Sequence, residues 1–151
     1  MRDKRRAKVC VVTSRRFGTL DVDNFKQLND RLGHQAGDAV LRVIGDVLRR
    51  SVRLFDVCAR YGGDEFAVLL PDNGDGSSAQ IAERIREGIE GSRPRGGPWS
   101  DDVRVTVSIG IASVLATTGE ELLARADQAL YLAKREGRNR VAVSAPPDRA
   151  S

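Results

Sequence analysis

The sequence has few aromatic residues, few cysteines and no long apolar run. Aromatic side chains make up 5% of the 151 residues, which argues against the stacking platforms that bind single-stranded nucleic acid. Cys10 and Cys58 have no Cys or His neighbour at metal-ligand spacing. A disulfide scaffold and a zinc site are therefore disfavoured, and a reducing cytoplasm is the natural compartment. The uncharged stretch from Val9 to Ser14 is too short for a membrane span or a signal-peptide core.

The rest of the composition allows one domain with a basic arm and a polar tail. Hydrophobic residues make up 40% of the chain, enough for a single core. The net charge of +4 suits a polyanionic ligand such as a nucleotide, although many inert domains share it. The first eight residues include five basic ones and predict a solvated arm, with nucleic-acid or membrane contact as the alternative. We therefore predict an arm over residues 1–16, a domain over 17–144 and a disordered tail over 145–151.

Hydrophobic spacing predicts an α/β fold in which an antiparallel hairpin joins a mixed sheet covered by helices. Gly33 is expected to end the first helix, and two glycines, Gly62 and Gly63, are typical of a hairpin turn. Alternating apolar residues over 103–109 predict a long half-buried strand. The expected strands are Phe17–Val22, Val57–Tyr61, Glu65–Leu70, Val103–Ile109 and Arg140–Val143, and the expected helices are Asn24–Leu32, Ala36–Ser51, one around Ile81–Ile89, and Glu120–Arg135.

Two acidic pairs occur where these elements end. Asp21 and Asp23 close the first strand, and Asp64 and Glu65 lie at the hairpin turn. Either pair alone is ordinary solvated surface in most proteins. The two glycines before Asp64, however, let a bulky ligand approach the backbone closely.

The junction after the first strand favours a phosphate group. A strand that leads directly into a helix leaves backbone N–H groups without partners, here those of Asn24 and Phe25. Mg²⁺ is commonly held by one or two carboxylates together with substrate phosphates. Two such ions would stabilise the attacking and leaving oxygens of an in-line phosphoryl displacement. The acidic pairs therefore predict a magnesium–nucleotide site.

Several segments in a fixed order resemble the GGDEF family, the diguanylate cyclases. The hairpin sequence Arg-Tyr-Gly-Gly-Asp-Glu-Phe at 60–66 is similar to the family signature, and the resemblance extends from about Leu20 to Val143. The other matching segments are Asp-Val-Asp-Asn-Phe-Lys-Gln-Leu-Asn-Asp at 21–30, Leu-Gly-His-Gln-Ala-Gly-Asp at 32–38, Val-Thr-Val-Ser-Ile-Gly at 105–110, and the positions Arg125–Asp127, Tyr131, Ala133, Lys134 and Gly137–Asn139 of the last helix and turn.

The resemblance implies a palm-like fold, related to polymerase palms and class III nucleotide cyclases, with the signature motif on a β-hairpin. It implies a bacterial signalling enzyme that condenses two GTP into cyclic di-GMP and two pyrophosphates where two domains face each other. Two Mg²⁺ ions per active site are expected, with Mn²⁺ as an alternative. A non-catalytic receptor for GTP or cyclic di-GMP is the alternative function.

The resemblance also implies a role for each matched acidic residue. Asp21 and Asp64 would ligate Mg²⁺ through their carboxylates, and Val22 through its backbone carbonyl. Asp64 or Glu65 would help to deprotonate the attacking 3′-hydroxyl.

Substrate contacts are implied for a second set of residues. Asn29 and Asp38 would bind the guanine edge and disfavour adenine. His34 would line the same pocket, with a packing or capping role as the alternative. Phosphate charge would be neutralised by Lys26, which would also act in the transition state, and by Lys134 and Arg138, although on their own these are ordinary solvated helix charges.

A regulatory site is implied by Arg53 and Asp56, which match the family's Arg-x-x-Asp product-binding motif and are separated from Gly62 by five residues. A guanidinium and a carboxylate at this spacing can bind a guanine edge and a phosphate of cyclic di-GMP. The alternative is a local ion pair at a helix end.

Upstream of Leu20 the sequence departs from the family pattern. Members carry a Leu-Thr-Gly-Leu-x-Asn-Arg-Arg segment and a full helix, whereas Thr13–Phe17 keeps only the end of that segment, so we expect the family's first helix to be truncated. Gly18 and Thr19 replace bulky strand residues, which predicts weak anchoring near Asp21, and the missing helix surface predicts an exposed apolar patch. We also expect that catalysis needs a homodimer and that a longer parent protein supplies a sensor or dimerisation module.

Overall fold

The computed structural model describes residues 15–71, 78–98, 103–114 and 118–144. The predicted tail and the first 14 residues of the predicted arm lie outside the described residues. The last two residues of that arm, Arg15 and Arg16, begin a strand rather than continuing the arm.

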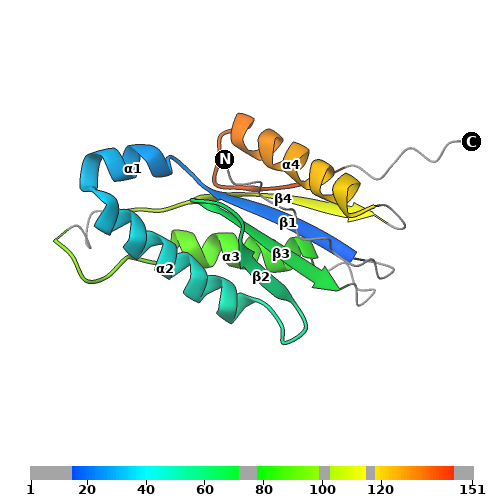
Figure 1. The fold of residues 1–151 in the computed structure, drawn as a ribbon, viewed down its shortest axis with the longest axis horizontal. Helices are drawn as coiled ribbons and strands as arrows, with labels where there is room; N and C mark the ends of the chain where they lie inside the picture. Colours follow the sequence, from blue (N-terminus) through cyan, green and yellow to red (C-terminus); the bar gives the residue numbers. More distant parts are fainter. Residues whose placement is uncertain (1–14, 72–77, 99–102, 115–117, 145–151) are drawn as a thin grey trace, which may run out of the picture.

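The described residues form a five-stranded mixed sheet, as the sequence predicted (Figure 1). The strand order is β2-β3-β1-β4-β5, so β1 is central and pairs antiparallel with β3 and β4. The β2–β3 hairpin is antiparallel, and β5 lies parallel to β4. The strands are β1 (Arg15–Val22), β2 (Val57–Arg60), β3 (Glu65–Pro71), β4 (Val107–Val114) and β5 (Val141–Val143).

Four helices accompany the sheet in the described residues, and their ends follow local signals. Gly33 has φ 87°, which ends the first helix and lets the second begin at His34, two residues before the predicted start. The last helix begins after Thr118, whose side chain accepts a hydrogen bond from the backbone N–H of Glu121 (3.2 Å). The helices are α1 (Phe25–Leu32), α2 (His34–Ser51), α3 (Ser78–Glu90) and α4 (Gly119–Arg135).

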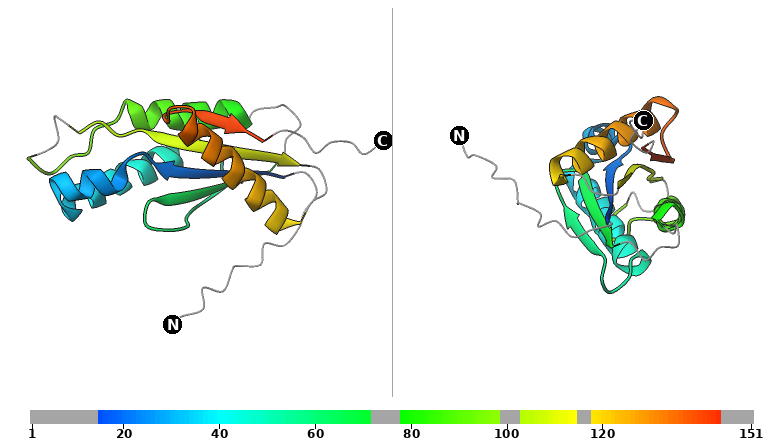
Figure 2. Two further views of the ribbon diagram at one scale, coloured as in Figure 1. Left: turned by 90° about the horizontal axis from the view of Figure 1, so that it is seen from above. Right: turned by 90° about the vertical axis from the view of Figure 1, so that its right-hand side faces the viewer.

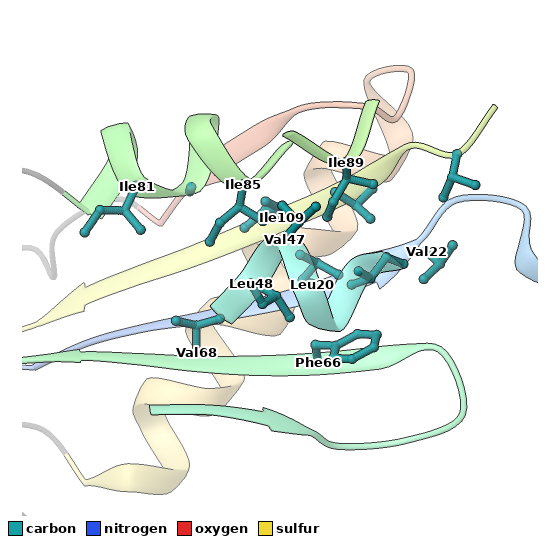
Figure 3. Close-up of a cluster of buried hydrophobic side chains, with 14 of the residues drawn as sticks. Leu20, Val22, Val47, Leu48, Phe66, Val68, Ile81, Ile85, Ile89 and Ile109 are labelled. Carbon is teal, nitrogen blue, oxygen red and sulfur yellow. The ribbon is translucent and has the colours of Figure 1, made fainter. Parts of the chain in front are cut away.

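Helices α2 and α3 cover one face of the sheet, and α4 covers part of the other (Figure 2). Alternate strand residues point into the core between the sheet and α2 and α3, because side chains alternate between the two faces of a strand. The labelled core residues in Figure 3 are Leu20, Val22, Val47, Leu48, Phe66, Val68, Ile81, Ile85, Ile89 and Ile109.

The predicted half-buried strand at 103–109 is wrong in both extent and burial. The strand begins at Val107, and Val103 and Val105 are buried in the irregular segment before it. Residues on both faces of β4 are buried, since Ser108 is 0% exposed. The reason is that α4 packs directly on this strand: a Cβ added to Gly110 would lie 2.2 Å from the backbone nitrogen of Leu130.

At Gly18 and Thr19 the central strand is anchored by its backbone rather than by bulky side chains. Gly18 lies opposite Val68 in β3 and Ile111 in β4, and both Gly18 and Thr19 are buried. Asp21 lies opposite Glu65 and Ser108 in the same ladders. Two-sided pairing thus fixes the position of Asp21 despite the small residues before it.

Candidate active site

The turn of the β2–β3 hairpin is closed by its own backbone and by an arginine. The backbone N–H groups of Tyr61 and Gly62 both donate to the Glu65 carbonyl, at 2.8 and 3.2 Å. The Arg60 guanidinium donates to the carbonyls of Gly62 (3.0 Å) and Gly63 (2.7 Å). These hydrogen bonds hold the loop that carries Asp64. The sequence alone predicted no role for Arg60.

The hairpin turn meets the end of β1 at the predicted metal ligands. The backbone N–H of Val22 donates to the Asp64 carbonyl (3.2 Å), and the side chain of Asp64 lies close enough to Asp21 to affect its ionisation. Lys134, which comes from α4, forms an ion pair with Asp21. The structure therefore brings together four of the predicted site residues, Asp21, Val22, Asp64 and Lys134.

Burial controls the ionisation of Asp21. Desolvation raises the pKa of Asp21 above its usual 3.8, the ion pair with Lys134 opposes this shift, and the neighbouring Asp64 adds to it. Two adjacent carboxylates repel each other, so a bound cation would favour this arrangement. In the described residues no cluster of three or more Asp, Glu, His or Cys side chains can hold a metal by itself. This donor set fits an ion that takes two carboxylates and completes its coordination with substrate phosphate.

The start of α1 lies next to these carboxylates. Asn24 has φ 54°, and its side chain makes no capping hydrogen bond, so the first turn of α1 receives no side-chain cap. The first turn contains no acidic residue, and Lys26 within it is exposed. A helix start with this charge and without a cap suits an anion, and phosphate binding by Asn24 and Phe25 stays a prediction.

The predicted guanine contacts lie where α1 and α2 meet. The side-chain oxygen of Asn29 is buried and has no hydrogen-bond partner in the part of the chain that the structure describes. A Cβ added to Gly37 would lie 2.0 Å from this oxygen, so Gly37 leaves room for the Asn29 side chain. Asp38 and His34 are exposed on α2, whose N-cap is Gly33. Sequence reasoning missed Gly37, although its position directly before Asp38 was a signal.

The turn after α4 carries Arg138. Gly137, Arg138 and Asn139 have φ values of 120°, 63° and 46°, so three consecutive residues are left-handed. Arg138 is exposed, and its backbone N–H donates to the Ala133 carbonyl (3.0 Å). The turn lies beside the site because the backbone N–H of Asn139 donates to the carboxylate of Asp23 (3.0 Å).

A pocket of about 230 Å³ opens beside Asp21 and Glu65, between α4 and the sheet. Asp21, Glu65 and Lys134 line it together with Asp127 and Tyr131 of α4. Burial raises the pKa of Asp127 above its usual 3.8. Asp127 and Tyr131 were recognised in the sequence only as part of the family pattern and had no assigned role.

Arg53 and Asp56 lie apart from this site, in the turn between α2 and β2. The Asp56 carboxylate accepts a hydrogen bond from the backbone N–H of Arg53 (2.6 Å), and in the described residues no ion pair joins the two side chains. The Arg53 side chain is exposed, as are Leu54 (92%) and Phe55 (81%) between them. The carboxylate therefore closes the turn and leaves the guanidinium available.

Known proteins are similar to this chain in sequence and in fold. Residues 12–140 match the family described as diguanylate cyclase, GGDEF domain. The chain is 43% identical over 124 residues to the response regulator PleD of Caulobacter vibrioides and 44% identical over 131 residues to the diguanylate cyclase DgcP of Pseudomonas aeruginosa. These matches cover 81% and 85% of the chain but only 27% and 19% of the relatives, so the chain spans about a fifth to a quarter of their length.

Two solved structures of similar fold contain a bound ligand or a partner protein. The GGDEF domain of DgcB from Caulobacter crescentus, in complex with c-di-GMP, has a TM-score of 0.80 and 37% identity, and the match covers 87% of this chain and 78% of that one. The diguanylate cyclase SiaD of Pseudomonas aeruginosa, in complex with its activator SiaC, has a TM-score of 0.80 and 36% identity, covering 87% and 50%. No helix in the described ranges is long and apolar enough to cross a membrane.

The family match covers most of the chain, and the palm-like fold agrees with it. The chain therefore belongs to the GGDEF family of diguanylate cyclase domains.

Proposed function

We propose that residues 17–144 form a catalytic domain that, with a second copy, condenses two GTP into cyclic di-GMP and two pyrophosphates. In each of two steps the 3′-oxygen of one GTP attacks the α-phosphorus of the other. The α–β phosphoanhydride bond breaks, and pyrophosphate leaves. The observation that carries the proposal is the convergence of Asp21, Asp64 and Lys134, from β1, the hairpin turn and α4.

Asp21 and Asp64, with the carbonyl of Val22, would hold two Mg²⁺ ions, or Mn²⁺ in their place. When bound, these ions would neutralise phosphate charge and stabilise the attacking and leaving oxygens. The pairing of Lys134 with Asp21 supports this assignment, because a cation already occupies the position next to the carboxylates. On metal binding, Lys134 would exchange the carboxylate for a phosphate oxygen.

The remaining charged residues accept the proton of the attacking hydroxyl or neutralise the phosphates. Asp64 or Glu65 accepts the proton of the 3′-hydroxyl, directly or through water. Lys26 at the start of α1 and Arg138 after α4 neutralise the triphosphate, with Lys26 acting on charge that develops in the transition state. The backbone N–H groups of Asn24 and Phe25 bind phosphate at the start of α1.

Guanine selectivity follows from the groups at the α1–α2 junction. The unpaired oxygen of Asn29 accepts an N–H of the guanine edge, and the Asp38 carboxylate accepts another. Adenine would leave the buried Asn29 oxygen without a donor, which is costly. His34 lines the mouth of the same pocket.

Each chain offers one GTP site, so the reaction requires two domains that face each other. The longer relatives support the further proposal that a sensor or dimerisation module in a parent protein brings them together. Product inhibition would act through Arg53 and Asp56. The exposed guanidinium of Arg53, which in the described part of the chain makes no ion pair with Asp56, supports this role. Because GTP is the substrate, the cytoplasm is the proposed compartment.

The proposal is tested by incubating the purified chain with GTP and Mg²⁺ and measuring cyclic di-GMP. A parent chain and a fusion with a parallel leucine zipper ahead of Met1 should be compared. Free domains lose several kcal/mol of translational and rotational freedom at each encounter, whereas the zipper gives roughly millimolar effective concentration. The fusion should therefore be faster per domain by about an order of magnitude or more at micromolar protein.

A folded zipper fusion that binds GTP and makes no cyclic di-GMP would overturn the cyclase proposal and favour the receptor. The control is a zipper with register-breaking substitutions, which should behave as the parent chain. Rates that depend on protein concentration for the control, and much less so for the fusion, would support catalysis between two domains.

A further inference from the structure

Asp23 is a buried carboxylate that joins three segments far apart in the sequence. It is only 9% exposed. One oxygen accepts the Ser108 hydroxyl (2.6 Å), and the other accepts the Thr106 hydroxyl (2.7 Å) and the backbone N–H of Asn139 (3.0 Å). These donors satisfy the buried charge, so Asp23 is held in place and is not itself available to a ligand.

The segment that Asp23 holds is strained. Arg138 and Asn139 are non-glycine residues in left-handed conformations directly after Gly137. Such conformations cost free energy and persist only where the surroundings enforce them, commonly at functional sites. The helix-terminating bonds, from Gly137 N–H to the Lys134 carbonyl (3.4 Å) and from Arg138 N–H to the Ala133 carbonyl (3.0 Å), stop at Arg138. The hydrogen bonds that hold Asn139 come instead from outside α4.

The side chain of Asn139 makes a second set of contacts that fix this residue. Its oxygen accepts a hydrogen bond from the Arg86 guanidinium (3.0 Å), and its nitrogen donates to Glu90 (3.0 Å), both on α3. Arg86 also pairs with Glu90 (2.8 Å). Asn139 is thus fixed by its backbone to Asp23 and by its side chain to α3, and both contacts lie one residue beyond Arg138.

We propose that Asp23 is a positioning residue for nucleotide binding, which holds the 137–139 turn so that Arg138 faces the phosphates of GTP. The inference rests on the proposed function. It assigns Asp23 a task different from that of Asp21 two residues earlier: Asp21 faces the metal and phosphate, whereas Asp23 acts through the Asn139 backbone. Loss of Asp23 should therefore weaken recognition of the phosphates and leave recognition of the guanine base intact.

The test measures binding by calorimetry in the presence of Mg²⁺, with two ligands. 3′-Deoxy-GTP carries the phosphates but lacks the attacking hydroxyl, and 3′-deoxyguanosine carries only the base and sugar. Asp23→Ala should weaken 3′-deoxy-GTP binding by roughly tenfold, the usual range for a charge-assisted hydrogen bond, and leave 3′-deoxyguanosine binding unchanged. An equal loss for both ligands would mean a general structural role and would overturn the proposal.

A double-mutant cycle distinguishes positioning from an independent contribution. If Asp23 acts through Arg138, then Asp23→Ala combined with Arg138→Ala should bind 3′-deoxy-GTP as weakly as Arg138→Ala alone. Additive losses would overturn the proposal. A parent chain that binds neither ligand would instead overturn the proposed function itself, so the two failures are distinguishable.

Further variants keep the test informative if Asp23→Ala does not fold. Asp23→Asn retains an oxygen that can accept the Asn139 N–H, and it should recover most of the 3′-deoxy-GTP affinity. Asn139→Gly keeps the left-handed backbone and the bond to Asp23 but loses the contact with α3, and it should weaken only 3′-deoxy-GTP. Ser108→Ala is the matched control: it removes a donor from the other oxygen of Asp23 and should leave both affinities unchanged, and a selective loss of 3′-deoxy-GTP in this variant would contradict the proposal.

Discussion

The two faces of the central sheet differ in what covers them. On one face α2 and α3 form a closed apolar layer with Leu20 and Val22 of β1. On the other face α4 packs on β4 at Gly110 and leaves a pocket beside Asp21, while Val57 at the far side of the sheet is 56% exposed. Successive residues of one strand thus have different roles: Leu20 packs in the core, and Asp21 lines the pocket where we propose that metal binds. Burial raises the pKa of Asp21 and disfavours its ionised form, which is the free-energy cost of placing a carboxylate beside a packed helix.

The largest expected effect is on the open face. Asp64→Asn should reduce cyclic di-GMP synthesis to background, because an amide is a poor ligand for Mg²⁺, while thermal unfolding stays close to that of the parent. Product formation by chromatography and unfolding by circular dichroism measure the two properties. The control Asp46→Asn, at an exposed position on α2, should retain activity. Turnover near the parent level in Asp64→Asn would remove Asp64 from the mechanism.

On the closed face a substitution should act on stability. Ile44 is 0% exposed, so Ile44→Ala should lower the free energy of unfolding by about 2–5 kcal/mol through lost burial and a residual cavity. Val57→Ala, on the open face, should lower it by less than about 1 kcal/mol. Urea denaturation measures both. Equal losses would show that the open face is covered in solution.

The packing of α4 on the open face can be tested at a single atom. Gly110→Ala should lower the free energy of unfolding by about 1–3 kcal/mol, because the new Cβ meets the backbone of Leu130 and Ala126 at 2.2 and 2.3 Å. The matched control is Gly45→Ala within α2, where nothing lies within 4 Å of the new Cβ. That variant should gain about 0.5–1 kcal/mol from helix propensity. A tolerated Gly110→Ala would mean that α4 is not seated on β4.

A smaller effect is expected at the turn that lies outside both faces. Arg53→Ala should weaken inhibition by cyclic di-GMP by roughly tenfold or more, because it removes a charged donor, and should leave the initial rate unchanged. Progress curves with added product measure the change. Asp56 should be left intact, since its carboxylate closes the turn by accepting the Arg53 backbone N–H. Unchanged product affinity in the variant would rule out the regulatory role.

The smallest expected effect concerns Asp127 on the open face. Burial raises its pKa in the folded state above 3.8, so its ionised form opposes folding at neutral pH. Asp127→Asn should therefore raise the Tm slightly at pH 7. The gain should shrink as the pH falls through the folded-state pKa and should vanish below about 3.8, where the carboxyl is protonated in both states. A gain that persists at low pH would point to packing rather than charge.

Much of the fold could be read from the sequence because its signals are local. Spacing of apolar residues indicated the helices, and paired glycines indicated the hairpin that carries Asp64. Burial was harder to predict. The alternation at 103–109 suggested one exposed face, but Ser108 is buried by a helix that follows later in the chain. Alternation of apolar and polar residues indicates which face of a strand points into the core. It does not indicate whether a helix covers the opposite face.

By itself, the sequence determined the order of elements, the family signature and the acidic residues at strand ends, since each depends on neighbours in the chain. Only the tertiary structure decided which distant groups meet. Lys134 reaches Asp21 across 113 positions, and the Asn139 backbone reaches Asp23 across 116. Both contacts require α4 to lie on β4, and that packing depends on the close approach which Gly110 allows. A local sequence pattern cannot predict such a close approach, because the approach depends on the backbone of a helix that begins nine residues later in the chain.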